Sequence, residues 1–468
     1  MNNLPEEFQK NMKEILGDEE YSLLEESYLQ EAVSSLRLNP LKKRSGDVTD
    51  ICGLFGLDKI PYDENGYFFD RETLPGRKPY HNAGAYYIQD PGAMIPGALL
   101  IGHLKEKNDG DFSDMRILDL CASPGGKSTQ IAMSMMGKGI LFSNEINRTR
   151  AEVLSENIER CGISNAVVLN EPSDRLADRF ENYFDAVIVD APCSGEGMFR
   201  KDPEAVKQWS PENVATCVER QRGILENAYR MLKPGGSMVY STCTFERSEN
   251  EDRVLELIND HPDIRVENID GFKKLVPGVS DGLEGCGDAM RMWPMHFKGE
   301  GQFAVLLTKD GISERGIPFG GYENSSAPKN MKPLEEFLGT SLNKETASFI
   351  KEAKKRFAMF GDNLYLMPEG TPSLSGLKVL RCGLHLGSFK KDRFEPAHAL
   401  ALALGNADAS LVKEVTEEEA QSFVKGMTLE GEGNGWCLVS LDGYSVGWGK
   451  ASGGRIKNHY PKGLRVPG

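Results

Sequence analysis

The sequence lacks several features that would place it in other classes of protein. It has no apolar run near the roughly 18 residues of a membrane span, and its start, "MNNLPEEFQK", has neither the basic end nor the apolar stretch of a secretory signal. Its nine cysteines include no Cys-x-x-Cys pair of the kind that binds zinc or performs redox chemistry. We therefore expect a cytoplasmic protein with reduced, mostly buried thiols, no membrane and no metal.

Positive charge is also scarce, since 55 Lys and Arg residues face 70 Asp and Glu residues, for a net charge of −15. This balance excludes a protein coated in basic residues for unspecific nucleic-acid binding and confines such contacts to local patches. Hydrophobic residues at 39% and charged residues at 27% are typical of a soluble globular protein. The 468 residues predict roughly three domains of about 150 residues each.

Residues 115–309 alternate short apolar segments with amphipathic segments of helical length, which predicts a parallel sheet covered by helices on both faces. The expected strands are "MRILDL", "GILFSNE", "FDAVIVD" and "SMVYSTC", and the expected helices include "KSTQIAMSMM", "RTRAEVLSENIERCG" and "SPENVATCVERQRGILENAYRML". Asp119, Glu145, Asp190 and Cys243 then fall at carboxyl ends of strands, where open α/β sheets bind ligands.

Local signals mark the ends of the helices. Gly162 is suited to a left-handed cap, and Ser210 followed by Pro211 predicts a helix start, with a stop at the turn "KPGG". Ser248 and Glu251 have the spacing of a capping box, which predicts another helix just after the last of these strands.

Composition also suggests where the domains end. We expect an N-terminal domain over 1–105 and the α/β domain over 106–310. The stretch "GISERGIPFGGYENSSAPKN" is typical of a linker, and "MPEGTPSLSG" marks a further break. These features predict a linker with a small intermediate domain over 311–375 and a last domain over 376–468.

The segment "DLCASPGGKST" ends like a triphosphate-binding loop, but Cys121 stands where that loop needs its first glycine. A dinucleotide fold needs spaced glycines, and here they are adjacent and follow Pro124. S-adenosylmethionine fits better, because a Gly-Gly turn admits a bulky ligand and Glu145 closes the next strand, where it can accept both ribose hydroxyls. Lys127 then either binds the cofactor's carboxylate or is simply solvated.

Six motifs in order carry a family resemblance. They are "SLRLNPLK", "GAYYIQDPGAM", "DLCASPGGKST", "DAPCSGEGMFRKD", "YSTCTF" and "RMWPMHFKGEGQFAVLL", spanning residues from about 35 to 309. The sequence resembles the RNA cytosine C5 methyltransferases of the RsmB/NOP group, and "FEPAHALALAL" and "KNHYPKGLR" look most like the RsmF-type enzymes. The resemblance implies a Rossmann-like class I methyltransferase core with an antiparallel last strand, an N-terminal α/β domain and a C-terminal PUA-like, β-rich RNA-binding region.

That activity explains why two cysteines are present. Carbon 5 of cytosine is a poor nucleophile, so a thiolate must first add to carbon 6, and a base must later remove the hydrogen from carbon 5. Spacing alone does not choose between the two thiols. The resemblance implies that Cys243 attacks, that Cys193 assists release, and that Asp190 holds the base through its ring nitrogen and amino group. DNA cytosine methyltransferases attack with the Pro-Cys thiol, but their Glu-Asn-Val segment is absent here. Enzymes that methylate amino groups use Asn/Asp-Pro-Pro-Tyr/Phe at this point, and Cys193 departs from that motif.

The resemblance also implies a set of cofactor contacts. Asn170 stands near where relatives often place an aspartate for the adenine, and Ser173 is an alternative. Arg150 is similar to a cofactor-site arginine, although a solvated helix arginine fits as well. The expected set is Cys121, Ala122, Ser123, Pro124, Gly125, Gly126, Lys127, Glu145, Arg150, Asn170 and Asp190.

A stacked cytosine hides carbon 6, so the target must be single-stranded or flipped out, and other residues must hold its flanks. The last 19 residues hold five Lys or Arg and no acid, and "FKKDRFEPAH" places cations beside aromatics. A solvated basic tail is the alternative. Asn39 and Lys42 share a family motif with Arg37. The expected RNA-binding residues are Arg37, Lys390, Lys391, Arg393, Lys450, Lys457, Lys462 and Arg465.

The resulting prediction is an enzyme that methylates cytidine in 16S rRNA, with ribosomal RNA or the small ribosomal subunit as its partner. A transfer RNA target is chemically identical and stays open. An RNA-binding assembly factor with a silent catalytic domain is also open, although the intact Asp190, Cys193 and Cys243 set argues against it.

Overall fold

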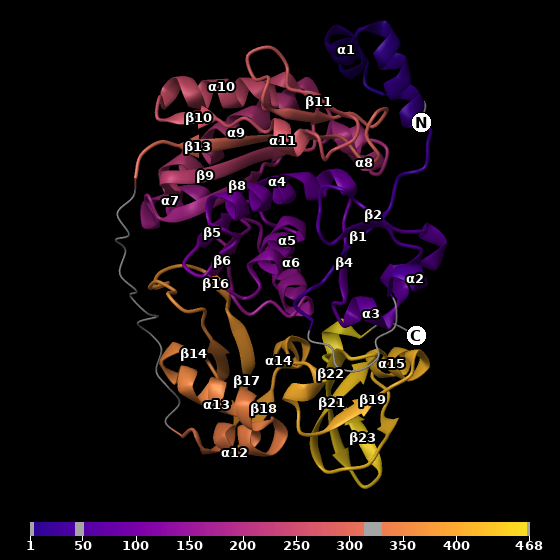
Figure 1. The fold of residues 1–468 in the computed structure, drawn as a ribbon, viewed down its shortest axis with the longest axis vertical. Coiled ribbons are helices and arrows are strands. Elements are labelled where there is room, and N and C mark those ends of the chain that lie inside the picture. The colour runs from indigo at the N-terminus through magenta and orange to yellow at the C-terminus, as the bar shows by residue number, and fades with distance from the viewer. Residues whose placement is uncertain (1–3, 43–50, 313–329, 466–468) are drawn as a thin grey trace.

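The computed structural model describes residues 4–42, 51–312 and 330–465. The expected linker "GISERGIPFGGYENSSAPKN" lies mostly outside these residues. Figure 1 shows the central sheet and its helices in the upper part of the molecule and two smaller C-terminal sheets below it. The fold is the predicted one, a methyltransferase core with N- and C-terminal additions.

The central sheet has the strand order β11-β12-β13-β9-β8-β5-β6-β7-β16. Its strands β5, β6, β7, β8 and β9 run parallel, and β13 returns antiparallel to β9, as expected of a class I methyltransferase. The bounds are β5 Arg116–Asp119, β6 Ile140–Asn144, β7 Ala166–Leu169, β8 Phe184–Asp190, β9 Leu232–Thr242, β10 Ile264–Val266, β11 Val279–Asp281, β12 Met290–Met292 and β13 Gln302–Lys309.

Two apolar clusters cover the two faces of this sheet. Ile117 and Leu118, adjacent on β5, belong to different clusters because strand side chains alternate between faces. One face packs on α4 (Pro91–Lys107), α5 (Gly126–Met135) and α6 (Arg148–Arg160). The other packs on α7 (Ser173–Arg179), α9 (Pro211–Met231) and α10 (Glu251–Asp260). The near-continuous apolar strands therefore follow from burial on both sides.

Most of the predicted helix ends are confirmed. Ser210 Oγ accepts the Asn213 N–H at 3.2 Å, and Gly162 has φ +71° after α6. The "KPGG" stretch is not a separate turn, because β9 already begins at Leu232 and shifts register there. The capping box is wrong: α10 begins at Glu251 itself, and that carboxylate is bound to Arg291 instead of an N-cap.

The N-terminal region consists of helix α1 and a small antiparallel sheet. Helix α1 (Glu6–Ser27), kinked at Gly17, packs Phe8 against Phe199 and Trp209 of the core domain. The rest forms a small antiparallel sheet of order β2-β3-β1-β4, with short helices between its strands. The bounds are β1 Ser35–Leu38, α2 Ile51–Phe55, β2 Asp58–Lys59, β3 Gly66–Phe68, α3 Pro79–Asn82 and β4 Tyr86–Ile88.

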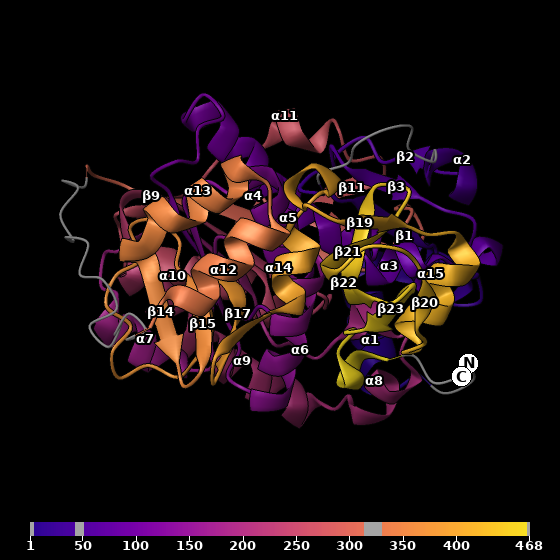
Figure 2. The ribbon, with the colours of Figure 1, turned by 90° about the horizontal axis from the view of Figure 1, so that it is seen from below.

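The C-terminal region forms two sheets, which lie side by side in Figure 2. One has the order β14-β15-β17-β18 and the other β19-β21-β22-β23-β20. Between β15 and β17 the chain leaves the first sheet, and β16 pairs antiparallel with β7 at the edge of the central sheet. The expected boundary at residue 375 therefore falls between strands of one sheet, and the boundary at residue 105 falls within α4. The bounds are α12 Lys332–Ser341, α13 Lys344–Glu352, β14 Phe357–Phe360, β15 Asn363–Leu366, β16 Val379–Cys382, β17 Leu384–Lys390, β18 Arg393–Pro396, α14 His398–Ala403, β19 Val412–Glu414, α15 Glu417–Val424, β20 Leu429–Glu430, β21 Gly435–Leu441, β22 Tyr444–Ser452 and β23 Arg455–Asn458.

Candidate active site

The glycine loop connects β5 to α5 at the carboxyl edge of the sheet. Gly125 has φ +112°, which favours glycine, and a Cβ on Gly126 would come within 2.8 Å of the Gln89 side chain. Lys127 is not solvated: it is buried, and its Nζ lies 2.6 Å from Oδ2 of Asp190. The loop therefore directs its cation to the end of β8.

Asp119 ends β5 beneath this loop with one oxygen unpaired. Its Oδ2 accepts the Ser128 hydroxyl at 2.7 Å, whereas Oδ1 has no hydrogen-bond partner among the described residues. Burial raises the pKa of Asp119 to about 7. An unpaired buried acceptor at a strand end is a place where a ligand donor would be stabilised.

Glu145, after β6, is buried and only partly satisfied by the protein. Its Oε1 accepts the Asn147 N–H at 2.8 Å, and Oε2 lies 3.5 Å from Nη2 of the exposed Arg150. Both amide hydrogens of Asn170 are used, because Nδ2 donates to the carbonyls of Glu145 and Ile146 at 2.8 Å each. Asn170 thus holds the turn that presents Glu145.

Ile146 is a residue of this site that the sequence motifs did not mark. Its side chain is 68% exposed, although it directly follows a buried carboxylate at the ligand edge of the sheet. An exposed aliphatic side chain there provides an apolar surface for a planar ligand. The only sequence signal was an apolar residue placed after the acid that ends the strand.

The two predicted cysteines meet at the next strand ends. Cys193 and Cys243 follow β8 and β9, and their sulfur atoms lie 3.3 Å apart. The contact with Cys243, together with burial, raises the pKa of the Cys193 thiol well above its usual value. Asp190 lies at the same edge, where its Oδ1 accepts the Ser241 hydroxyl at 2.8 Å.

Two buried carboxylates, which the sequence motifs also left unmarked, connect the cysteine loops. Glu196, on the Cys193 loop, accepts the Phe245 N–H at 2.9 Å from the Cys243 loop. Glu249, beyond Cys243, accepts the backbone N–H of Ser194 at 2.9 Å in return. Each loop therefore supplies an acceptor for the other, which fixes their separation.

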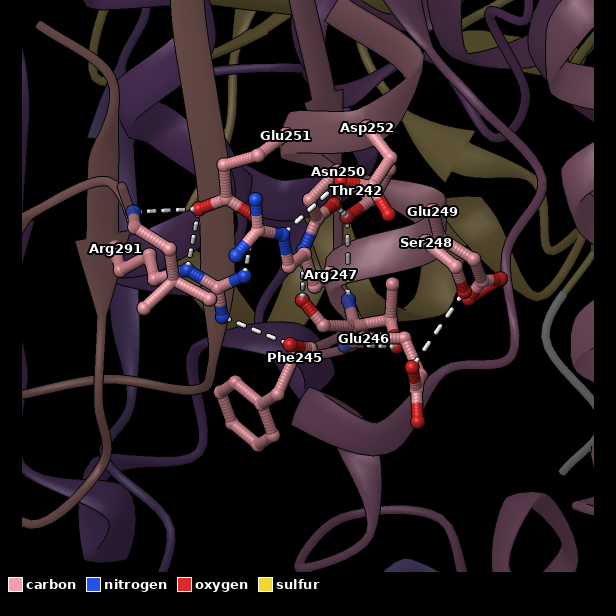
Figure 3. A network of polar contacts seen from close by, with 12 residues as sticks. Thr242, Phe245, Glu246, Arg247, Ser248, Glu249, Asn250, Glu251, Asp252 and Arg291 are labelled. Atoms are coloured by element: carbon pink, nitrogen blue, oxygen red, sulfur yellow. Dashed lines mark hydrogen bonds and ion pairs between the residues drawn. The ribbon is translucent and has the colours of Figure 1, made fainter. Parts of the chain in front are cut away.

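A buried ion pair supports the loop after Cys243. Figure 3 shows Arg291 beside Glu251 and the carbonyl of Phe245. The Nη2 to Oε2 distance in the pair is 2.6 Å, and Nη1 donates to the Phe245 carbonyl at 2.8 Å. Both side chains are almost fully buried, so loss of either partner would leave a buried charge unpaired and destabilise the loop.

Arg37, an expected RNA contact because of its family motif, is buried in this structure and bound within the protein. It is 1% exposed, and Nη2 donates to the Gly126 carbonyl at 2.6 Å and to Thr129 Oγ1 at 2.9 Å. The neighbouring motif residues are also buried: Asn39 donates to the Cys161 carbonyl and Lys42 to the Leu402 carbonyl. The motif "SLRLNPLK" therefore joins the N-terminal, central and C-terminal parts of the chain.

The C-terminal cations are mostly exposed, and two stretches far apart in sequence meet. Lys450 and Lys457 are cross-strand partners on β22 and β23, and Lys450 Nζ lies 5.4 Å from the ring centre of Trp436. His459 packs edge-on against Trp436, and burial together with Lys457, Lys450 and Arg393 lowers its pKa. We call Arg393, Trp436, Lys450, Lys457 and His459 the C-terminal basic surface.

The remaining predicted cations differ in their surroundings. Lys390 and Lys391 are exposed at the turn between β17 and β18, with Lys390 Nζ 3.9 Å from Asp362, and Lys462 is exposed near the end of the described chain. Arg465 is half-buried, and Nη2 donates to the Tyr460 carbonyl at 3.3 Å. Arg465 thus anchors the last segment of the described chain.

Residues 4–42, 51–312 and 330–465 contain neither a metal cluster nor a membrane-spanning helix. No group of three or more His, Cys, Asp or Glu side chains there is arranged to hold a metal ion. None of the helices in those ranges has the length and apolar character needed to cross a membrane.

Four family models together match most of the chain. The model of 16S rRNA methyltransferase RsmB/F matches residues 104–308, and the RsmF N-terminal domain matches residues 4–91. The first C-terminal domain of RsmF matches 341–404, and the RsmF PUA domain matches 410–466.

Individual relatives agree with these models. Ribosomal RNA small subunit methyltransferase F of Shewanella piezotolerans is 33% identical over 449 residues, covering 92% of this chain and 90% of that protein. The protein of that name from Escherichia coli is 32% identical over 442 residues with the same coverage.

Among solved structures, NSun6 from Pyrococcus horikoshii has a TM-score of 0.56 at 19% identity, covering 66% of this chain and 99% of that one. A methyltransferase homolog from the same organism has a TM-score of 0.51 at 24% identity, covering 63% and 91%. The chain therefore belongs to the RsmF family of S-adenosylmethionine-dependent 16S rRNA methyltransferases.

Proposed function

We propose that this chain methylates carbon 5 of a cytidine in small-subunit ribosomal RNA, with Cys243 as the nucleophile and Cys193 as the group that allows release. The observation that carries this proposal is the 3.3 Å approach of the two thiols at the sheet edge that also holds Asp190 and Glu145. Two thiols side by side match a reaction that needs one sulfur nucleophile and one nearby base.

The residues at the ends of β5 and β6 fit S-adenosylmethionine. Glu145 Oε2 lies 3.5 Å from Arg150 and would accept ribose hydroxyls, and Ile146 would cover the adenine. Asp119 Oδ1 would accept from the amino acid end of the cofactor, below the glycine loop. The Asn170 oxygen is left for the adenine amino group, because both hydrogens of its amide are used. When bound, the cofactor supplies an electrophilic methyl group.

The chain's own groups would control the nucleophile and the proton. Cys243 as thiolate adds to carbon 6, and Asp190, with Lys127 against it, holds the amino edge of the base. The largest cause that raises the pKa of Cys193 is its contact with Cys243. Once Cys243 is bonded to carbon 6 this cause disappears, so Cys193 ionises more readily and can remove the hydrogen from carbon 5.

The C-terminal basic surface would hold RNA outside the active site. Exposed lysines beside Trp436 and His459 provide phosphate contacts and aromatic surface together, as single-stranded RNA requires. Ribosomal RNA, free or within the small subunit, is the proposed partner, and the cytoplasm is the proposed location of the reaction. Arg37 has no part in this surface.

The test is to incubate the enzyme with S-adenosylmethionine and, separately, with naked small-subunit rRNA, small subunits and transfer RNA, and to map 5-methylcytidine by bisulfite sequencing. We expect methylation of the small-subunit RNA with the wild type and none with Cys243→Ala. Methylation of transfer RNA alone would show that the substrate is transfer RNA and not small-subunit rRNA. RNA binding without methylation of any substrate would favour the assembly-factor alternative.

A further inference from the structure

Four side chains connect the two cysteine loops in a buried chain of polar contacts. Ser194 follows Cys193, and Thr244 follows Cys243. Glu249 Oε2 lies 2.7 Å from Ser194 Oγ, Ser194 Oγ lies 2.7 Å from Thr244 Oγ1, and Thr244 Oγ1 lies 2.9 Å from Glu196 Oε2. The two carboxylates are fully buried and the two hydroxyls nearly so. The chain of contacts therefore runs from one cysteine loop to the other without help from water.

Counting hydrogens shows that this chain needs one proton more than its hydroxyls provide. Three oxygen-to-oxygen contacts each need a hydrogen between them, and the two hydroxyls supply only two. If Ser194 donates to Glu249 and Thr244 donates to Glu196, the two hydroxyl oxygens face each other at 2.7 Å with no hydrogen between them. A proton on one carboxyl group satisfies all three contacts.

We propose that Glu196, Thr244, Ser194 and Glu249 share one extra proton and, as positioning residues, set the separation of the Cys193 and Cys243 thiols. Burial raises the pKa of Glu196 to about 8 and also raises that of Glu249, so the extra proton stays in the chain at neutral pH. The Gly197 N–H donates to the Cys243 carbonyl at 2.9 Å, so movement of either loop reaches the nucleophile directly. In its link to catalysis the inference rests on the proposed function.

Burial and a nearby negative charge favour retention of this proton, and other hydrogen bonds oppose it. Glu196 also accepts from Trp209 and from the Phe245 N–H, and Glu249 from the Ser194 N–H and Gln221, which lowers the pKa of each carboxyl group. Glu246 lies close enough to raise the pKa of both carboxyl groups. The other titratable groups that face these four side chains are Tyr28, Cys193, Cys217, Cys243 and Tyr240. Arg200 and Glu300 lie beyond Tyr28, and Arg253 lies beyond Tyr240.

The proton count predicts different effects for two nearby substitutions. In Glu249→Gln, the amide N–H donates to Ser194, Ser194 to Thr244 and Thr244 to an ionised Glu196, so all three contacts survive loss of the extra proton. In the wild type, loss of the extra proton above about pH 8 should lower the rate of methyl transfer. This decrease should be absent in Glu249→Gln. Glu246→Gln removes a nearby charge outside the chain, which lowers the pKa of Glu196, so the fall should begin at lower pH.

The experiment measures single-turnover methyl transfer from pH 6 to 10 for the wild type, Glu249→Gln and Glu246→Gln. A second readout needs neither RNA nor methyl transfer: the rate at which diamide, an azo oxidant that accepts two electrons and two protons, joins Cys193 and Cys243 in a disulfide. Thr244→Val removes the hydroxyl that links Ser194 to Glu196, and it is compared with Thr244→Ser, which keeps a hydroxyl. Circular dichroism verifies that both variants are folded. We expect closure about tenfold or more slower in Thr244→Val.

The proposal is overturned if Glu249→Gln loses activity at the same pH as the wild type, or if both Thr244 variants close the disulfide at equal rates. If the wild type transfers no methyl group but the Thr244 variants differ as expected, the proposed function fails and the role of the chain in positioning the thiols stands.

Discussion

Arg37 and the C-terminal basic surface look alike in the sequence and differ completely in the fold. Both place cations in a motif of an RNA-modifying family. Arg37 is 1% exposed and donates to the backbone of the glycine-loop helix, whereas Lys450 and Lys457 are exposed on neighbouring strands. Charge therefore identifies a phosphate contact only where the fold leaves the cation in water. A buried cation satisfied by carbonyls joins parts of the molecule instead.

Among the buried cations, the largest loss of stability is expected on substitution of Arg291. Arg291→Leu leaves Glu251 buried without its partner, which should lower the free energy of unfolding by about 3–5 kcal/mol. Urea unfolding of the purified protein measures this change. Arg222→Leu is the matched control, because its partners Glu219 and Glu256 are on the surface and its removal should leave stability nearly unchanged. Equal decreases in both variants would contradict the account of buried cations.

A smaller decrease in stability is expected at Arg37. Arg37→Leu removes the donor to Gln89 Oε1 and one of the donors to the Gly126 carbonyl, which should cost about 1–3 kcal/mol in unfolding free energy. The dependence of RNA affinity on salt should not change, because the Arg37 side chain is buried away from any phosphate in solution. A reduced salt slope in filter-binding measurements, with normal stability, would restore Arg37 as an RNA contact.

The C-terminal basic surface should show the opposite behaviour. Lys450→Gln with Lys457→Gln should weaken RNA binding and reduce the slope of log affinity against log salt by roughly 2, about one for each lysine that no longer neutralises a phosphate. Thermal unfolding should change little because both side chains are exposed. An unchanged slope would show that the RNA binds elsewhere.

The smallest effect is expected at Arg150. Its side chain is 58% exposed, and its Nη2 lies 3.5 Å from Oε2 of Glu145, so Arg150→Ala should weaken cofactor binding by no more than about fivefold. Glu145→Ala should weaken it further, since it removes a buried acceptor. Isothermal titration with S-adenosylmethionine compares the two. If Arg150→Ala had the larger effect, Arg150 would itself be a cofactor contact.

The alternation of apolar and amphipathic segments was enough to predict the core sheet, because burial on both faces leaves a strong pattern in residues such as Ile117 and Leu118. Strand ends also predicted which edge carries Asp190, Cys193 and Cys243. The sequence could not reveal that β16 returns to this sheet, because a four-residue edge strand after a linker has no periodicity of its own. The spacing of Ser248 and Glu251 misled, because tertiary pairing with Arg291 outweighed a local cap.

The structural carboxylates were hidden for a similar reason. Glu196 and Glu249 lie in polar segments that are typical of solvated loops, and their burial depends on two loops 50 residues apart coming together. Nothing local in the sequence distinguishes a carboxylate that accepts N–H groups across such a contact from one in water. The motifs themselves marked the cysteines, but not the groups that hold them.

The most direct test of the central claim is to trap the covalent intermediate. Cys193→Ala is incubated with cofactor and small-subunit rRNA, separated on a denaturing gel beside the wild type and the Cys193→Ala/Cys243→Ala double variant, and the shifted band is digested for mass spectrometry. We expect an RNA-linked band in Cys193→Ala alone, with the bond at Cys243, because attack proceeds while release fails. A band that persists in the double variant, or no band in Cys193→Ala although the RNA is bound, would contradict Cys243 as the nucleophile.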